Sequence, residues 1–172
     1  MEIRWLEGGD VDACVGLNNA SIPAVSEIDV AGLQRLVDQS AASLVVVDDD
    51  PHHGRQDDVV GFCIVLGPGV DYGSVNYRWF SERYDDFAYL DRIVVADHYR
   101  NNGAGAALYG EVERRLAAVA PWLLCEVNLR PRNDGSLRFH ARLGFTEVGQ
   151  QDTNYGITVS MLAKPLAPTT AR

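Results

Sequence analysis

The sequence has few cysteines and no long apolar run. Its three cysteines, Cys14, Cys63 and Cys125, lie in apolar segments, and none forms a Cys-x-x-Cys pair. These spacings argue against a disulfide framework and a structural zinc site, so we expect buried thiols in a reducing compartment. No window approaches the roughly eighteen apolar residues of a membrane span, and the N-terminal segment lacks the apolar core of a signal peptide.

Basic surface is also scarce. The net charge is −9, and no basic stripe is interleaved with aromatic residues. Such a chain repels nucleic acid and anionic membranes, so we expect neither as a partner. Because the sequence shows neither a signal peptide nor a membrane span, we expect a cytoplasmic location. His52 and His53 lie among aspartates, but the stretch is typical of a solvated charged turn, so no metal is expected. The length predicts one domain over residues 1–172, with a frayed tail at 165–172.

Apolar periodicity predicts alternating strands and helices. The expected strands are 3–6, 43–47, 59–66, 88–95, 123–129, 145–149 and 157–163, and the four expected helices are 10–20, 29–37, 105–120 and 136–143. Residues 67–87 are rich in aromatics without a clear period. We expect a long loop there that acts as a lid, a substrate wall or a dimer contact; the alternative is that its aromatics cover the sheet edge.

The stretch RNNGAG, Arg100–Gly105, joins a predicted strand to a predicted helix. The first amides of a helix have no partner inside it, and the helix dipole is positive there. Gly103 and Gly105 have no β-carbon, so a ligand can approach the backbone, and the amides from Asn101 to Ala106 can converge on one anion. Arg100 adds a cation at the rim. The stretch therefore predicts a phosphate cradle.

Two familiar nucleotide-binding motifs do not match this stretch fully. A Walker A loop needs a lysine followed by serine or threonine, and neither is present. A dinucleotide fingerprint needs a small residue where Leu108 stands, although Glu126 lies about twenty residues on, where a ribose-binding acid is expected. A dinucleotide enzyme stays open as an alternative.

The flanking residues resemble the Gcn5-related N-acetyltransferase (GNAT) superfamily. In YLDRIVVADHYRNNGAGAALY, the residues Arg100, Gly103 and Gly105 match the three fixed positions of its acetyl-CoA motif. NDGSLRFHARLGF resembles its second signature through Asn133, Ser136, Phe139, Arg142, Gly144 and Phe145. The motifs cover about residues 88–150. NYRWFSERYDDFAYLDRIVV and EVNLRPRNDGSLRFHARLGF also look like a less characterised bacterial branch.

The resemblance implies an α+β, GNAT-like (acyl-CoA N-acyltransferase) fold, with a mixed, twisted sheet of about seven strands and four helices on both faces. It implies acetyl-CoA as co-substrate and no metal. The residues implied for the coenzyme are the backbone of Ile93, Val94 and Val95, the cradle of Arg100, Asn101, Asn102, Gly103, Ala104, Gly105 and Ala106, and then Asn133 and Ser136. The thioester is expected between the strands 88–95 and 123–129, with the Val94 amide polarising its carbonyl.

The implied reaction is acetyl transfer to a primary amine by direct attack in a ternary complex. Asp91 and Glu126 are the candidate bases, directly or through a water. Asp91 can instead pair with Arg92 or Arg83, and Glu126 can be a surface carboxylate. His140 stands where the family often has a tyrosine that protonates the thiolate; it can instead be a packing residue.

The acceptor is expected to be a small-molecule or peptide amine. Its site is implied from loops that contain Asn19, Tyr72, Asn76, Tyr77, Trp79 and Tyr155, and nearby acids favour a cationic amine. A homodimer through the aromatic segment or the last strands is possible. The alternative function is a non-catalytic acyl-CoA-binding sensor or interaction module, which needs the cradle but neither base nor acid.

Overall fold

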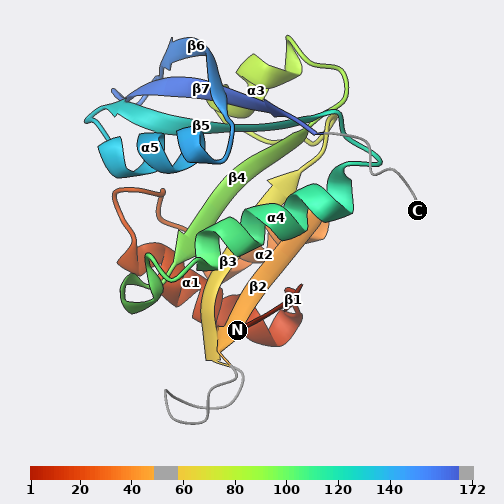
Figure 1. The fold of residues 1–172 in the computed structure, drawn as a ribbon, viewed down its shortest axis with the longest axis vertical. Coiled ribbons are helices and arrows are strands. Elements are labelled where there is room, and N and C mark those ends of the chain that lie inside the picture. Colours follow the sequence, from red (N-terminus) through yellow and green to blue (C-terminus); the bar gives the residue numbers. More distant parts are fainter. Residues whose placement is uncertain (49–57, 167–172) are drawn as a thin grey trace. The chain divides into compact units, whose positions relative to one another are not determined.

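The computed structural model describes residues 1–48 and 58–166. Within these ranges it has seven strands and five α-helices (Figure 1). The strands are β1 (Glu2–Trp5), β2 (Ala42–Asp48), β3 (Asp58–Leu66), β4 (Ala88–Val95), β5 (Trp122–Arg130), β6 (Thr146–Asp152) and β7 (Thr158–Pro165). The helices are α1 (Val11–Ala20), α2 (Val30–Gln39), α3 (Val75–Ser81), α4 (Ala104–Leu116) and α5 (Asp134–Arg142), with 3-10 turns η1 (Gly8–Asp10) and η2 (Asp97–Tyr99). His52, His53 and the tail beyond residue 166 lie outside the described residues.

The strands form one mixed sheet in the order β1-β2-β3-β4-β5-β7-β6. β1 pairs antiparallel with β2 and β2 with β3, as do β5 with β7 and β6 with β7. β4 and β5 run parallel through the pairs Ala88 with Leu123 and Tyr89 with Leu124. The predicted α+β class with a mixed seven-stranded sheet is confirmed. Every expected strand is present; β4 has the expected ends, and the other strands begin or end at different residues.

The chain divides into two compact units that share β4 and α4. Unit 1 consists of Met1–Leu66 and Asp91–Arg114, and unit 2 consists of Gly67–Leu90 and Arg115–Arg172. The single domain expected over residues 1–172 stays a prediction.

Unit 1 is built on strands whose apolar runs predict burial on both faces. β2, ASLVVVD, is buried along its whole length. Helices α1 and α2 both contact β3. Leu33 and Leu36 are the buried residues of α2, and Asp29 begins that helix by accepting a hydrogen bond from the Gly32 amide at 2.7 Å. The spacing of apolar residues and an N-cap aspartate therefore explain this helix.

Helix α3 of unit 2 corrects the prediction of an irregular aromatic segment over 67–87. Ser74 caps it through its hydroxyl, which accepts from the Tyr77 amide at 3.3 Å. Tyr77 and Phe80 point inward, with exposed fractions of 4% and 0%. The helix was missed because it has only seven residues and because its aromatic residues have modest helix propensity. Residues 1–48 and 58–166 therefore contain five α-helices in place of the expected four.

Trp79 of α3 packs on Gly149 of β6. A β-carbon on Gly149 would lie 2.6 Å from the Trp79 Cζ2 atom. The indole is held from two other sides, since Phe80 contacts its edge and the Arg83 guanidinium lies 4.0 Å from its ring centre. The glycine therefore makes room for an aromatic ring that has little freedom to move.

We expect Gly149→Ala to lower the free energy of unfolding by about 1–3 kcal/mol, because the new methyl group forces the indole from its place. Gly110→Ala is the matched control. Gly110 is an exposed residue of α4 whose β-carbon would meet no atom within 4 Å, so the same substitution there should stabilise by about 0.5–1 kcal/mol. Urea unfolding of both variants measures the difference, and equal effects would contradict the packing argument.

Candidate active site

The turn before α4 lies in unit 1 and has an unusual backbone. Asn101 has φ 66° and Gly103 has φ 85°. Glycine and asparagine are the residues that adopt such angles most easily. A β-carbon on Gly103 would meet no atom within 4 Å. The glycine is therefore explained by backbone conformation, and the space beside it is open to a ligand.

The amides of this turn fall into two groups. The Asn102 amide donates to Tyr99 O at 3.4 Å, so one of the amides expected in the cradle is used inside the turn. The Ala107 amide donates to Gly103 O at 2.9 Å. The amides of Ala104, Gly105 and Ala106 come before Ala107 in α4, and no carbonyl of the same helix lies within their reach. They are the donors available to an anion at this helix start.

The turn is tied to the strands of unit 1 at its N-terminal end. The Tyr99 hydroxyl of η2 donates to the Asp48 carboxylate at the end of β2. Arg100 is half exposed and forms an ion pair with Asp97, with 3.0 Å between Nη2 and Oδ1. The expected rim cation is therefore present at the surface, where an anionic ligand can compete with Asp97 for it. Of the β4 residues expected to bind the coenzyme, Val94 is buried and Ile93 and Val95 are partly exposed.

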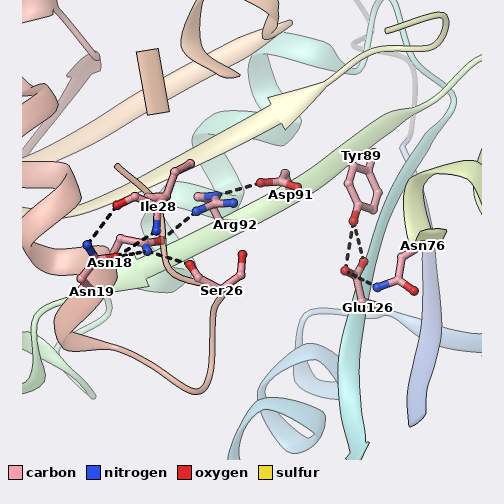
Figure 2. Close-up of polar contacts among 9 residues, drawn as sticks. All are labelled: Asn18, Asn19, Ser26, Ile28, Asn76, Tyr89, Asp91, Arg92 and Glu126. Atoms are coloured by element: carbon pink, nitrogen blue, oxygen red, sulfur yellow. Dashed lines mark hydrogen bonds and ion pairs between the residues drawn. The ribbon is translucent and has the colours of Figure 1, made fainter. Parts of the chain in front are cut away.

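Glu126 of β5 is the centre of a hydrogen-bonded cluster in unit 2 (Figure 2). The Tyr89 hydroxyl lies 3.0 Å from its Oε1 and 2.9 Å from its Oε2, and Asn76 Nδ2 donates to Oε1 at 2.9 Å. Tyr89 and Asn76 are 1% and 2% exposed, whereas Glu126 is partly exposed. A carboxylate oriented by two buried donors, and still open to solvent, suits proton transfer.

Asn76 extends this cluster to the last two strands. Its Oδ1 accepts from Gln151 Nε2 at 2.8 Å, and its Nδ2 also lies 3.3 Å from the Tyr155 hydroxyl. Tyr155 is 60% exposed and lies between β6 and β7. The structure thus brings Asn76 and Tyr155, both predicted from the sequence, to Glu126. It adds Tyr89 and Gln151, which were not predicted. A tyrosine on a strand is typical of a core residue, so the sequence does not mark Tyr89 as part of a site.

Asp91 and Asn19 lie in a different cluster, in unit 1 (Figure 2). Asp91 pairs with Arg92, with 2.8 Å between Oδ2 and Nε, and both side chains are at most 5% exposed. Asn19 binds the backbone of Ile28 through both ends of its amide. The pairing of Asp91 with Arg92 was one of the two alternatives that the sequence left open.

His140 is buried in α5, where its Nδ1 lies 2.7 Å from Ser136 O and 3.2 Å from Ser136 Oγ. A carbonyl oxygen only accepts, so Nδ1 carries a hydrogen in this contact. Phe145 lies against the imidazole, with 5.4 Å between ring centres. Burial lowers the pKa of His140 below its usual 6.5, although the bond to Ser136 opposes this. The favoured form at neutral pH is therefore uncharged, with Nε2 unprotonated.

Asn133 and Ser136, expected at the coenzyme arm, form the N-cap of α5. Asn133 Oδ1 accepts from the Ser136 amide at 3.0 Å. Asn133 is therefore the N-cap of α5. Among the aromatic residues expected at the acceptor site, Tyr77 is buried, and its hydroxyl donates to Gly67 O at 2.7 Å and accepts from the Val70 amide. Tyr72 contacts Tyr77 edge-on at 5.8 Å.

The lowered pKa of His140 predicts a pH-dependent stability. As the pH falls, His140 takes up its proton in the unfolded chain before it does so in the folded protein. The contribution of this residue to the free energy of unfolding is therefore fully present above pH 6.5, and it decreases as the pH falls from there toward the folded-state pKa. The slope for one proton is at most about 1.4 kcal/mol per pH unit. We expect His140→Gln to flatten this slope below pH 6.5. Asp10 and Glu147 also have lowered pKa values, but these two carboxylates change the free energy of unfolding only below their usual pKa values of 3.8 and 4.5. Urea unfolding at several pH values decides, and parallel profiles for both proteins would contradict the assignment.

Solved N-acetyltransferases share this fold. Arabidopsis thaliana NAA60 in complex with a bisubstrate analogue has a TM-score of 0.79 at 18% identity, over 98% of this chain and 99% of that chain. Ard1 from Thermoplasma volcanium has 0.73 at 16%, over 96% and 97%. The ribosomal-protein-S18-alanine N-acetyltransferase from Escherichia coli has 0.70 at 17%, over 96% and 94%. At these identities the likeness shows the fold alone.

The family follows from a separate comparison. The family model described as the acetyltransferase (GNAT) family matches residues 21–145, well over half of the chain. The chain therefore belongs to the acetyltransferase (GNAT) family, and it is an acyltransferase that uses acetyl-CoA. The expected resemblance is confirmed at the level of the family. No curated protein matches the chain.

Two further features are absent from residues 1–48 and 58–166. No group of three or more histidine, cysteine, aspartate or glutamate side chains there is arranged to hold a metal ion. None of the helices in these ranges is long and apolar enough to cross a membrane. Cys14, Cys63 and Cys125 are buried as predicted, and burial raises the pKa of Cys14 and Cys63 to about 12. Such thiols are poor nucleophiles at neutral pH.

Proposed function

We propose that the protein transfers the acetyl group of acetyl-CoA to a primary amine by direct attack in a ternary complex. The observation that carries the proposal is the Glu126 carboxylate, which buried Tyr89 and Asn76 orient from two sides. When the amine attacks the thioester, its nitrogen becomes positively charged and must lose a proton to give a neutral amide. A fixed, partly exposed carboxylate can accept that proton directly or through one water.

The turn before α4 would hold the donor. Its positive-φ residues Asn101 and Gly103 present the amides of Ala104, Gly105 and Ala106 at a helix start, where a diphosphate finds donors and a favourable dipole. Arg100 would leave Asp97 for the diphosphate. We assign the backbone of Ile93, Val94 and Val95 to the pantetheine arm, with the Val94 amide as the donor to the thioester oxygen.

The reaction breaks the thioester C–S bond and forms an amide C–N bond. The amine nitrogen supplies the electron pair, its proton goes to Glu126, and the thiolate of coenzyme A leaves. For His140 we favour packing over the acid role, because its Nδ1–H is directed at Ser136 O and its burial disfavours a second proton. Asn133 and Ser136 would reach the coenzyme from the start of α5.

The acceptor would bind near Glu126 in unit 2. We assign its contacts to the predicted aromatic and amide residues of α3 and its flanks, with the exposed ring of Tyr155. The contact predicted for Asn19, which lies in unit 1, is a separate part of the proposal. The assigned residues of α3 and the segment before it are Tyr72, Asn76, Tyr77 and Trp79. A carboxylate favours a cationic amine. The name of the Escherichia coli neighbour gives an alanine of ribosomal protein S18 as the residue it acetylates, so peptide amines belong in the test together with small amines. A homodimer is a further part of the proposal.

The test is a panel of amines assayed with acetyl-CoA for release of free thiol, with the acetylated product identified by mass spectrometry. The panel contains peptides with a free N-terminal alanine, the same peptides with a blocked N-terminus, polyamines and amino acids. Thiol release with one class and not with blocked peptides supports the proposal. Binding of acetyl-CoA by calorimetry without turnover on any amine would favour the non-catalytic module instead.

A further inference from the structure

The loop at residues 21–29, between α1 and α2, has no buried side chain. Ile22 is 46% exposed, and Ile28 is only partly covered. Burial of apolar surface therefore cannot hold the loop in one conformation, and its shape has to come from hydrogen bonds.

Two neighbouring asparagines at the end of α1 make those hydrogen bonds. Asn19 accepts from the Ile28 amide at 3.1 Å and donates to Ile28 O at 3.0 Å, so its side chain pairs with the loop as a strand would. Asn18 is fully buried and donates from Nδ2 to Ser26 O and to Asn19 Oδ1, both at 2.9 Å. The second half of the loop is thus attached to α1 by side-chain amides.

A buried ion pair on β4 orients these amides (Figure 2). Arg92 donates from Nη1 to Asn18 Oδ1 at 3.0 Å and from Nε to Asp91 Oδ2 at 2.8 Å. An amide oxygen held by a guanidinium leaves the Nδ2 end of Asn18 facing the loop. A buried ion pair adds little net stability, but removal of one partner is costly, and such groups serve to select one conformation.

We propose that Arg92 is a positioning residue: through Asn18 and Asn19 it fixes the backbone of residues 26–28, and Asp91 is its counter-ion. That this loop then presents the acceptor amine rests on the function proposed above. Asp91 accordingly holds Arg92 and takes no proton from the substrate.

Arg92→Met tests the proposal. It removes the charge and keeps an apolar stem. We expect amide hydrogen exchange in residues 25–28 to become about tenfold faster or more, because the loop then opens locally. Arg4→Met is the matched control: Arg4 forms a two-point ion pair with Asp10 of η1 in the same unit, at 2.7 and 2.8 Å. It should lower the Tm and leave exchange in 25–28 unchanged.

Two further variants keep the test decisive if Arg92→Met does not fold. Arg92→Met combined with Asp91→Asn leaves no unpaired buried charge. Asn19→Asp keeps the oxygen that accepts from Ile28 and loses the nitrogen that donates to it. Both should accelerate exchange in residues 25–28. Unchanged exchange in a folded variant without Arg92 would overturn the proposal, whether or not an amine substrate is known.

Steady-state kinetics give the second readout once the amine panel has found a substrate. For Asn19→Asp and the double variant we expect KM for the amine to rise about fivefold or more, with KM for acetyl-CoA and kcat within about twofold. Asp91→Asn alone separates counter-ion from base: a rise in amine KM with faster loop exchange supports the proposal. A loss of kcat with an unchanged loop would make Asp91 the base and overturn it. Absence of thiol release from the unaltered protein is failure of the proposed function, and the exchange data still decide the role of Arg92.

Discussion

Glu126→Gln is expected to lower kcat by about 100-fold or more, with little change in KM for acetyl-CoA. The amide keeps the shape of the side chain and its Oε1 can still accept from Tyr89 and Asn76, but it cannot accept a proton. General-base catalysis contributes about 10²- to 10⁴-fold to such reactions, so the loss should be of this size. Stopped-time assays of thiol release with saturating amine measure it.

The matched control is Glu147→Gln. Glu147 is an exposed carboxylate of β6 in the same unit, and it accepts from the Ser160 hydroxyl. The same chemical change there should leave kcat within about twofold. Tyr89→Phe is an intermediate case, since it removes a donor that orients both oxygens of Glu126 and leaves the carboxylate. Full activity of Glu126→Gln at neutral pH would show that the amine loses its proton elsewhere, and would remove Glu126 as the base.

Gly103→Asp is expected to raise KM for acetyl-CoA by about 10- to 100-fold. Asp tolerates positive φ, and a β-carbon at position 103 would meet no atom within 4 Å, so the fold should persist. The new carboxylate would then stand beside the diphosphate, where two like charges a few ångströms apart repel strongly despite screening. Calorimetric titration with coenzyme A measures the loss without any acceptor.

Gly103→Asn separates charge from shape. It has the same size and the same tolerance of positive φ, but no charge, so the difference between the two variants reports electrostatic repulsion alone. We expect the Gly103→Asn variant to bind coenzyme A more tightly than the Gly103→Asp variant, by most of the predicted loss of about 10- to 100-fold. The difference in affinity should shrink as salt is added. Equal affinities for the two variants would place the diphosphate away from this turn.

The elements of the fold that were predicted correctly are those whose signal is local. The strand-turn-helix order around Gly103 depends on residues within a few positions of one another, so the sequence displays it directly. Helix α3 was missed for the opposite reason. Its propensity is modest, and its stability comes from Tyr77 and Phe80 packing into unit 2, which no short window reveals.

The partners of the charged residues were the least accessible from sequence. Glu126 and Asp91 looked equivalent, since each is an acid on a strand expected near the thioester. Asp91 has its partner next to it in the chain, whereas Glu126 meets Tyr89 and Asn76 from 37 and 50 positions away. Such distant pairs form only when strands and helices are packed. They show that Glu126 is an oriented, partly exposed carboxylate, whereas Asp91 is the counter-ion of a buried arginine.

The seven strands, the glycine turn and the family could all be predicted from local patterns, because hydrophobic period and backbone freedom are properties of short segments. The folded structure was needed to see that two buried side chains hydrogen-bond Glu126, that His140 is buried against Ser136 O, and that Asn18 and Asn19 bind the loop at 21–29. Those outcomes depend on burial and on hydrogen bonds between residues far apart in the chain, and such bonds exist only after the chain has folded.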